Sequence, residues 1–216
     1  MRRGGLVMLL VMLAAIGIAG CISPGFNYAA NTSDHTYFKV PTGWSKVSTD
    51  ELASALNGGQ PAPISSGLWL VGYDASSSPT ARDATNSAAD KPFVTGLVEH
   101  INQTATSSLS YDGLRDFFLP VTSGARQSAA ASGFPLTNFH LLQDQMLTPG
   151  QGVHGVREVF QYTYPGGVTD TFDQVALTNA DATVVYALML HCTTGCYQHQ
   201  QSQINTVMKS FTVRSP

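Results

Sequence analysis

Charge is what this chain of 216 residues has least of: 12% of its residues are Asp, Glu, Lys or Arg, and the net charge is −3. Nucleic-acid surfaces need clustered Lys and Arg, and no such patch is present, so we expect no nucleic acid as a partner. The nucleophile elbow of hydrolases, the zinc-protease helix motif and the phosphate-binding glycine loop are also missing. We therefore expect no catalytic residues, no metal site, no cofactor and no enzymatic activity.

A long apolar run is missing as well. The apolar stretch from Leu6 to Ala19 is shorter than the roughly 20 residues that span a bilayer. Arg2 and Arg3 precede it, and Ile18-Ala19-Gly20-Cys21 follows it as a lipobox. These features predict a lipoprotein signal peptide over residues 1–20 and lipidation at Cys21. Two acyl chains anchor a protein stably, which predicts a cell-membrane location on the extracytoplasmic side. An ordinary cleaved signal is the alternative.

Cysteines are few, and their number fits export. The chain has three, and an odd thiol in an exported protein calls for an explanation. Lipidation of Cys21 leaves Cys192 and Cys196, for which the oxidising compartment favours a disulfide. The nearby His191 and His199 make a zinc site the alternative.

The first half of the chain predicts a flexible tether over residues 21–34 and a single domain over residues 35–216. Ser48 and Glu51 form a capping box for a helix over Thr49–Leu56. The stretch from Asp74 to Lys91 has no apolar periodicity and predicts a long surface loop. Three strands are predicted in this half: Tyr37–Val40, Leu68–Tyr73 and Phe93–Asn102.

Leu114, Phe117, Phe118 and Val121 have the spacing of one helical face. We expect a helix from near Ser110 that breaks around Pro120, and a second piece over Ser123–Ser132. Leu114, Phe117 and Phe118 bring more apolar bulk than one helix contact needs. They are the candidate lining of an apolar cleft between sheet and helices, and a deeper core is the alternative.

The last third predicts an antiparallel meander and a closing helix over Tyr197–Lys209, followed by a short strand or tail at Phe211–Val213. The run from Thr183 to Leu190 is apolar almost throughout, which is typical of a central strand covered on both faces. Val168–Thr178 contains interleaved polar residues and is expected to be peripheral. The four meander strands are predicted at Asn138–Leu147, Val153–Tyr164, Val168–Thr178 and Ala182–Cys192.

His154 and Glu158 are the remaining candidates for a metal or acid–base pair. Residues four apart on a strand are separated by roughly 13 Å, from about 3.3 Å per residue. That is too far for both to bind one ion, so we interpret them as part of an exposed strand face.

Pro41-Thr42-Gly43-Trp44 after an aromatic first strand, the capped first helix, the meander, the closing helix and Lys209-Ser210-Phe211 together resemble the PsbP/Mog1 superfamily. Within it, the chain is most similar to the LpqN-type lipoproteins of actinobacteria. The resemblance covers about Thr36 to Val213. It implies an α+β fold, an α/β/α sandwich with a central antiparallel sheet, in a superfamily of binding and assembly proteins without a shared catalytic site.

We therefore expect a membrane-anchored envelope lipoprotein with a non-enzymatic binding or assembly role. Its partner would be an envelope protein or an apolar lipid ligand. An envelope hydrolase with an active site assembled from distant residues, and a purely structural spacer, are the alternatives.

Overall fold

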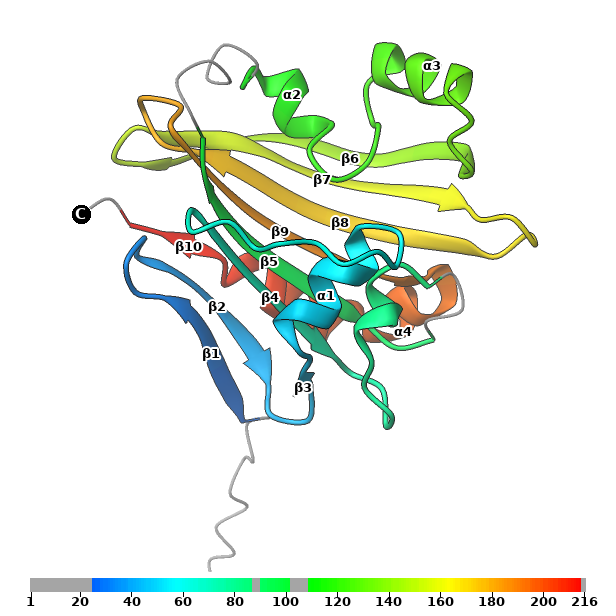
Figure 1. Ribbon diagram of the computed structural model, residues 1–216, viewed down its shortest axis with the longest axis horizontal. Helices are drawn as coiled ribbons and strands as arrows, with labels where there is room; N and C mark the ends of the chain where they lie inside the picture. Colours follow the sequence, from blue (N-terminus) through cyan, green and yellow to red (C-terminus); the bar gives the residue numbers. More distant parts are fainter. Residues whose placement is uncertain (1–24, 87–89, 102–108, 215–216) are drawn as a thin grey trace, which may run out of the picture.

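The structure, a computed structural model, describes residues 25–86, 90–101 and 109–214, so the predicted signal peptide and Cys21 lie outside the described residues. A seven-stranded sheet with the order β3-β4-β5-β9-β8-β7-β6 forms its centre (Figure 1). Every neighbouring pair is antiparallel. The strands are β3 (Ser45–Lys46), β4 (Leu68–Asp74), β5 (Phe93–His100), β6 (Thr137–Gly150), β7 (Val153–Thr163), β8 (Thr169–Thr178) and β9 (Val184–Thr193).

Both faces of this sheet are covered. One face packs against α4 (Thr194–Lys209) and a small sheet of β1 (Phe26–Asn31), β2 (Thr36–Pro41) and β10 (Thr212–Val213). The other face lies under α1 (Thr49–Leu56), the short helix η1 (Ala81–Ala84) and α2 (Tyr111–Arg115). α3 (Ser123–Ala131) has no buried residue and contacts β6 through Arg126, which lies over the Phe139 ring. The predicted α/β/α sandwich with a central antiparallel sheet is confirmed. So is the central position of β9, which is buried from Val184 to Cys192.

The flexible tether predicted over residues 21–34 is wrong from Gly25 onward. β1 pairs with β2 along its whole length, from Phe26 opposite Pro41 to Asn31 opposite Thr36. The Thr42 amide also donates to the Gly25 carbonyl at 2.9 Å. The sequence did not predict this strand because its buried positions hold only Ala29 and Asn31, which give little apolar periodicity.

The small sheet packs on the large one through an unusually close contact. A Cβ atom placed on Gly96 of β5 would lie 2.8 Å from Cε1 of Phe38 in β2, closer than non-bonded carbon atoms approach. Glycine at this position lets the fully buried Phe38 ring lie against the sheet. The glycine that interrupts the apolar pattern of β5 therefore fixes the position of β2.

The predicted helix near Ser110 is shorter than its apolar spacing indicates. α2 ends at Arg115, and the Asp116 carboxylate then accepts hydrogen bonds from the Val121 amide at 2.7 Å and from the amide and hydroxyl of Thr122 at 2.8 and 2.7 Å. These bonds stabilise a loop instead of further helical turns. Leu114, Phe117, Phe118 and Val121 consequently do not share one helical face, and the helix ends at Arg115, before the break predicted around Pro120.

The predicted surface loop from Asp74 to Lys91 contains η1, whose Ala81 and Ala84 are buried. Asp74 organises its first half, because its carboxylate accepts from the Ser76 amide and hydroxyl and from the Thr80 amide at 2.8 to 2.9 Å. Alanine carries too weak an apolar signal to predict this buried turn.

β8 is buried from Asp170 to Thr178, so its predicted peripheral position is wrong. It has a strand on each side and a layer on each face, and its polar side chains are therefore inside the molecule. The other three meander strands agree with the prediction within three residues at each end, and the closing helix begins earlier than predicted, at Thr194.

Candidate binding surface

The candidate cleft residues lie in and beside the core. Leu114 has no exposed surface, and its carbonyl accepts from Gln174 Nε2 at 3.4 Å. Phe117 and Phe118 are half-buried, and their rings meet edge to face at 5.2 Å. Leu114 thus fits the alternative of a deeper core and has no exposed surface to offer a ligand.

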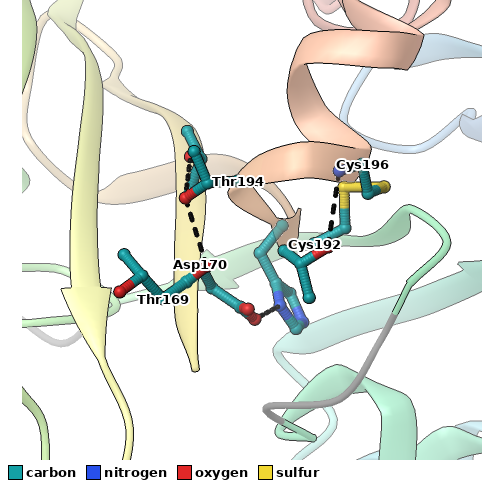
Figure 2. The surroundings of a disulfide bond; sticks show 8 residues. Thr169, Asp170, Cys192, Thr194 and Cys196 are labelled. Carbon is teal, nitrogen blue, oxygen red and sulfur yellow. Dashed lines mark hydrogen bonds and ion pairs between the residues drawn. A yellow bond between two sulfur atoms is a disulfide. The ribbon is translucent and has the colours of Figure 1, made fainter. Parts of the chain in front are cut away.

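The predicted disulfide joins Cys192, near the end of β9, to Cys196 in the first turn of α4 (Figure 2). Both cysteines are buried. The Thr193 hydroxyl caps this turn by accepting from the Cys196 amide at 3.4 Å. Since both sulfur atoms are bonded to each other, they are not zinc ligands, and the described residues contain no other metal-binding group of three or more side chains.

His191 and Asp170 form a buried pair beside the disulfide. Nδ1 of His191 lies 3.2 Å from Oδ2 of Asp170, and burial raises the pKa of the Asp170 carboxyl. The imidazole stacks on Phe172 at 5.4 Å and lies 6.3 Å from the Phe93 ring. A hydrolase would aim Nε2 of such a histidine at a nucleophile, but among the described residues this atom has no hydrogen-bond partner.

A second polar cluster lies between β7, β8 and α4. Asp173 accepts from Arg157 Nε at 3.0 Å, from Arg157 Nη2 at 2.7 Å and from the Tyr197 hydroxyl at 2.9 Å. Asp173 is completely buried, so its charge is compensated by a two-pronged guanidinium contact. The cluster ties α4 to the sheet.

The expectation of an exposed strand face at His154 and Glu158 is wrong for Glu158, because the Glu158 side chain has no exposed surface. Gln174 Nε2 donates to Glu158 Oε2 at 2.8 Å and to the Arg115 carbonyl at 2.6 Å. Burial is the main cause that raises the pKa of Glu158 to about 7. Arg115 in turn donates to Asp144 of β6 from Nε at 3.0 Å. This network fixes the end of α2 on the sheet.

In contrast to these buried polar clusters, β6 has apolar side chains at an open edge of the sheet. Within the described part of the chain, it is the last strand of the sheet and pairs with β7 alone. Leu141, Leu142 and Met146 are 43%, 49% and 59% exposed. Its pairing with β7 has register shifts near both ends and between Leu141 and Gln143, but runs without interruption from Gln143 to Leu147. This stretch leaves a regular row of outward backbone N–H and C=O groups.

An apolar groove of about 500 Å³ lies beside this edge. It runs between the second half of β6 and the end of α4. Its apolar lining residues include Met146, Leu147, Val175, Leu177, Met208 and Phe211, and Arg157 and Lys209 also border it. The groove is therefore on the α4 face of the sheet, whereas the sequence placed the candidate cleft under α2.

Sequence reasoning missed this surface, although a signal for it was present. The strand predicted at Asn138–Leu147 is the first of the meander, and a first strand has a meander neighbour on only one side. Leucines in an edge strand are therefore open to solvent or to a partner.

None of the helices in the described part of the chain combines the length and the apolar character of a membrane span.

Comparisons with known proteins identify the fold. No family model matches the sequence, and no curated protein matches it. Among solved structures, the solution structure of cyanobacterial PsbP (CyanoP) from Synechocystis sp. PCC 6803 is similar at a TM-score of 0.53 and 16% identity, over 95% of this chain and 99% of that chain. The chain has the PsbP-like fold.

Two further solved structures are similar to a lesser degree. The Ran-binding protein Mog1p of Saccharomyces cerevisiae has a TM-score of 0.45 and 12% identity, over 88% of this chain and 96% of that one. LpqN, involved in cell envelope biogenesis of Mycobacterium tuberculosis, has a TM-score of 0.42 and 14% identity, over 83% of each chain. The predicted fold is confirmed by the likeness to the PsbP structure.

Proposed function

We propose that this chain is an envelope lipoprotein, anchored on the extracytoplasmic side of the cell membrane through Cys21, that binds another envelope protein. The edge of β6 is the observation that carries the binding role. The anchor is supported by the cysteines: Cys192 and Cys196 are joined, which leaves Cys21, the residue that ends the lipobox, as the unpaired cysteine of the three.

The partner contributes an extended segment that pairs with β6. An open strand edge presents alternating N–H and C=O groups, and another extended backbone satisfies them while its alternate side chains enter neighbouring pockets. The uninterrupted stretch from Gln143 to Leu147 supplies the backbone row. The adjoining groove accepts an apolar side chain, because Met146 and Leu147 belong to both the edge and the groove.

The alternatives receive less support. A hydrolase needs a nucleophile next to an activating base, and the buried His191–Asp170 pair has no partner on Nε2 among the described residues. A purely structural spacer would not explain three exposed apolar side chains on an open strand edge.

Site-specific photo-crosslinking in intact cells tests the binding role. A photoreactive residue at Gln143 should yield a discrete protein adduct, whereas the same residue at Ser54 of α1, on the other side of the molecule, should not. A lipid adduct at Gln143 would assign the groove to an acyl ligand instead. Equal adducts at both positions, or none at Gln143, would contradict the proposal.

Membrane fractionation with intact-mass measurement tests the anchor separately. The mature chain should begin at Cys21 and carry the mass of acyl chains. Cys21→Ala should lose this mass and be misprocessed. A wild-type chain without acyl mass would refute the lipoprotein assignment and leave the β6 experiment to be judged alone.

A further inference from the structure

The ordered strand β1 brings the folded body close to the proposed anchor. Gly25, the first described residue, follows Cys21 by four positions, and its carbonyl already accepts from the Thr42 amide. Four residues span at most about 14 Å. If Cys21 is acylated, as the proposed function requires, the start of β1 therefore lies within about 14 Å of the lipid headgroups.

The outer face of the small sheet starts at this point. Strand alternation sends Ala29 and Phe38 inward to the core, and their immediate neighbours along each strand outward. The outward residues of the small sheet and its continuation include Phe26, Tyr28, Tyr37, Lys39 and Arg214, which we call the aromatic–basic face. Tyr28 is 65% exposed.

Cations and rings alternate on the aromatic–basic face. Lys39 Nζ lies 5.9 Å from the centre of the Phe26 ring, and the Arg214 guanidinium lies 6.0 Å from that of Tyr37. β1, β2 and β10 contain no Asp or Glu. The nearest carboxylate along the chain, Asp34 in the β1–β2 turn, is engaged by Asn31 Nδ2 at 2.6 Å and His100 Nε2 at 2.7 Å.

We propose that the aromatic–basic face docks on anionic lipid headgroups of the membrane that holds the anchor. Tyr and other aromatic side chains favour the bilayer interface, and Lys and Arg near a surface are attracted by anionic lipids. The chain as a whole has a net charge of −3, so the local absence of carboxylates decides which face turns to the membrane.

Docking in this orientation leaves the other end of the molecule free. Figure 1 shows β1 and β2 at the lower left, and β6 with α2 and α3 along the top. The β6 edge is not part of the aromatic–basic face and remains open to a partner protein, although the groove beside it extends to Phe211, next to β10.

Hydroxyl-radical footprinting of the full lipidated chain tests this orientation. The chain is reconstituted in phosphatidylcholine vesicles with and without phosphatidylglycerol, at 0.1 M and 1 M salt, where the Debye lengths are about 10 Å and 3 Å. Labelling of Tyr28 is normalised to that of Met146 on β6, which has a similar exposed fraction of 59%. We expect several-fold protection of Tyr28 in phosphatidylglycerol vesicles at 0.1 M salt and recovery at 1 M.

Charge variants give the matched controls. Lys39→Gln and Arg214→Gln should each weaken docking by about fivefold, the effect of one basic residue near an anionic surface. Arg82→Gln removes an exposed charge from η1 on the other side of the sheet and should leave Tyr28 protected.

Three results would overturn the inference, and they are distinguishable. Tyr28 labelled equally under all conditions, with acylated Cys21 confirmed by intact mass, would refute the docking alone. Equal protection in vesicles without phosphatidylglycerol would refute the role of anionic lipids. An unacylated Cys21 in a chain that does not stay with the vesicles would refute the anchor on which the inference rests.

Discussion

β8 and β6 both pair with β7, yet they use opposite chemistry. β8 carries Asp170, Asp173 and Gln174 into the interior, whereas β6 leaves Leu141, Leu142 and Met146 exposed. Position in the sheet, not residue type, sets this burial, since β8 has neighbours on both edges and β6 on one. Each of these three β8 side chains has a partner within the chain, His191, Arg157 or Glu158, although Asp170 Oδ1 and Gln174 Oε1 accept no hydrogen bond among the described residues. The apolar groups of β6 are open to a partner from outside the chain.

Removing a carboxylate from β8 should have the largest effect. Asp173→Ala leaves Arg157 unpaired between the sheet and α4, and breaking a buried ion pair costs about 3–5 kcal/mol. Urea denaturation should show this loss in the free energy of unfolding. The double variant Arg157→Met with Asp173→Leu removes both charges and should cost less than the single one. A loss below about 1 kcal/mol for Asp173→Ala would mean that the uncompensated charge of Arg157 costs little, which would contradict the expected cost of breaking a buried ion pair.

Glu158, the cross-strand neighbour of Gln174 in β8, should make stability depend on pH. Its pKa of about 7 in the folded chain is above the ordinary 4.5. Between these values the folded form holds a proton that the unfolded form releases, so the free energy of unfolding falls as pH rises from 4.5 to 7, by up to ~3 kcal/mol.

Glu158→Gln removes this titration and is the control. The difference in unfolding free energy between the wild type and Glu158→Gln should decline across that window, while Asp170, whose raised pKa acts in the same direction, is common to both chains. A difference that stays constant with pH would show that Glu158 is ionised throughout.

Removing the buried disulfide should lower the free energy of unfolding by a smaller amount. Replacing both Cys192 and Cys196 by Ala opens a short loop, for which chain entropy predicts a loss of about 2 kcal/mol. The midpoint of urea denaturation should fall accordingly, and thiol titration of the folded wild type should find neither cysteine free. Two reactive thiols in that titration would refute the bond.

The sequence predicted the structure correctly where a local pattern of side chains matches the position of the segment in the fold. The apolar run of β9 identified the centre of the sheet, and the Ser48 cap placed α1 at its observed bounds. The prediction failed where contacts with distant parts of the chain determine which side chains are buried. The carboxylates of β8 indicated exposure because their partners, Arg157 and Tyr197, come from other elements. β1 and η1 were hidden because their inward side chains are small.

The candidate binding surface was the least predictable part. Apolar spacing directed attention to Leu114 and Phe117, but the Asp116 hydrogen bonds end the helix between them. The groove beside β6 combines β6, β8 and the end of α4, and no local pattern connects segments so far apart in the chain.

Substitutions in β6 should have the smallest effect on stability. They also give the most direct test of β6 as the binding edge. Leu142→Lys and its control Leu56→Lys on α1 replace leucines that are 49% and 40% exposed. Each should change the free energy of unfolding by no more than about 0.5 kcal/mol. The measurement is the yield of the protein adduct from a photoreactive residue at Gln143 in cells carrying each variant. We predict loss of the adduct with Leu142→Lys and an unchanged yield with Leu56→Lys. An adduct that survives Leu142→Lys would contradict the assignment of β6 as the binding edge.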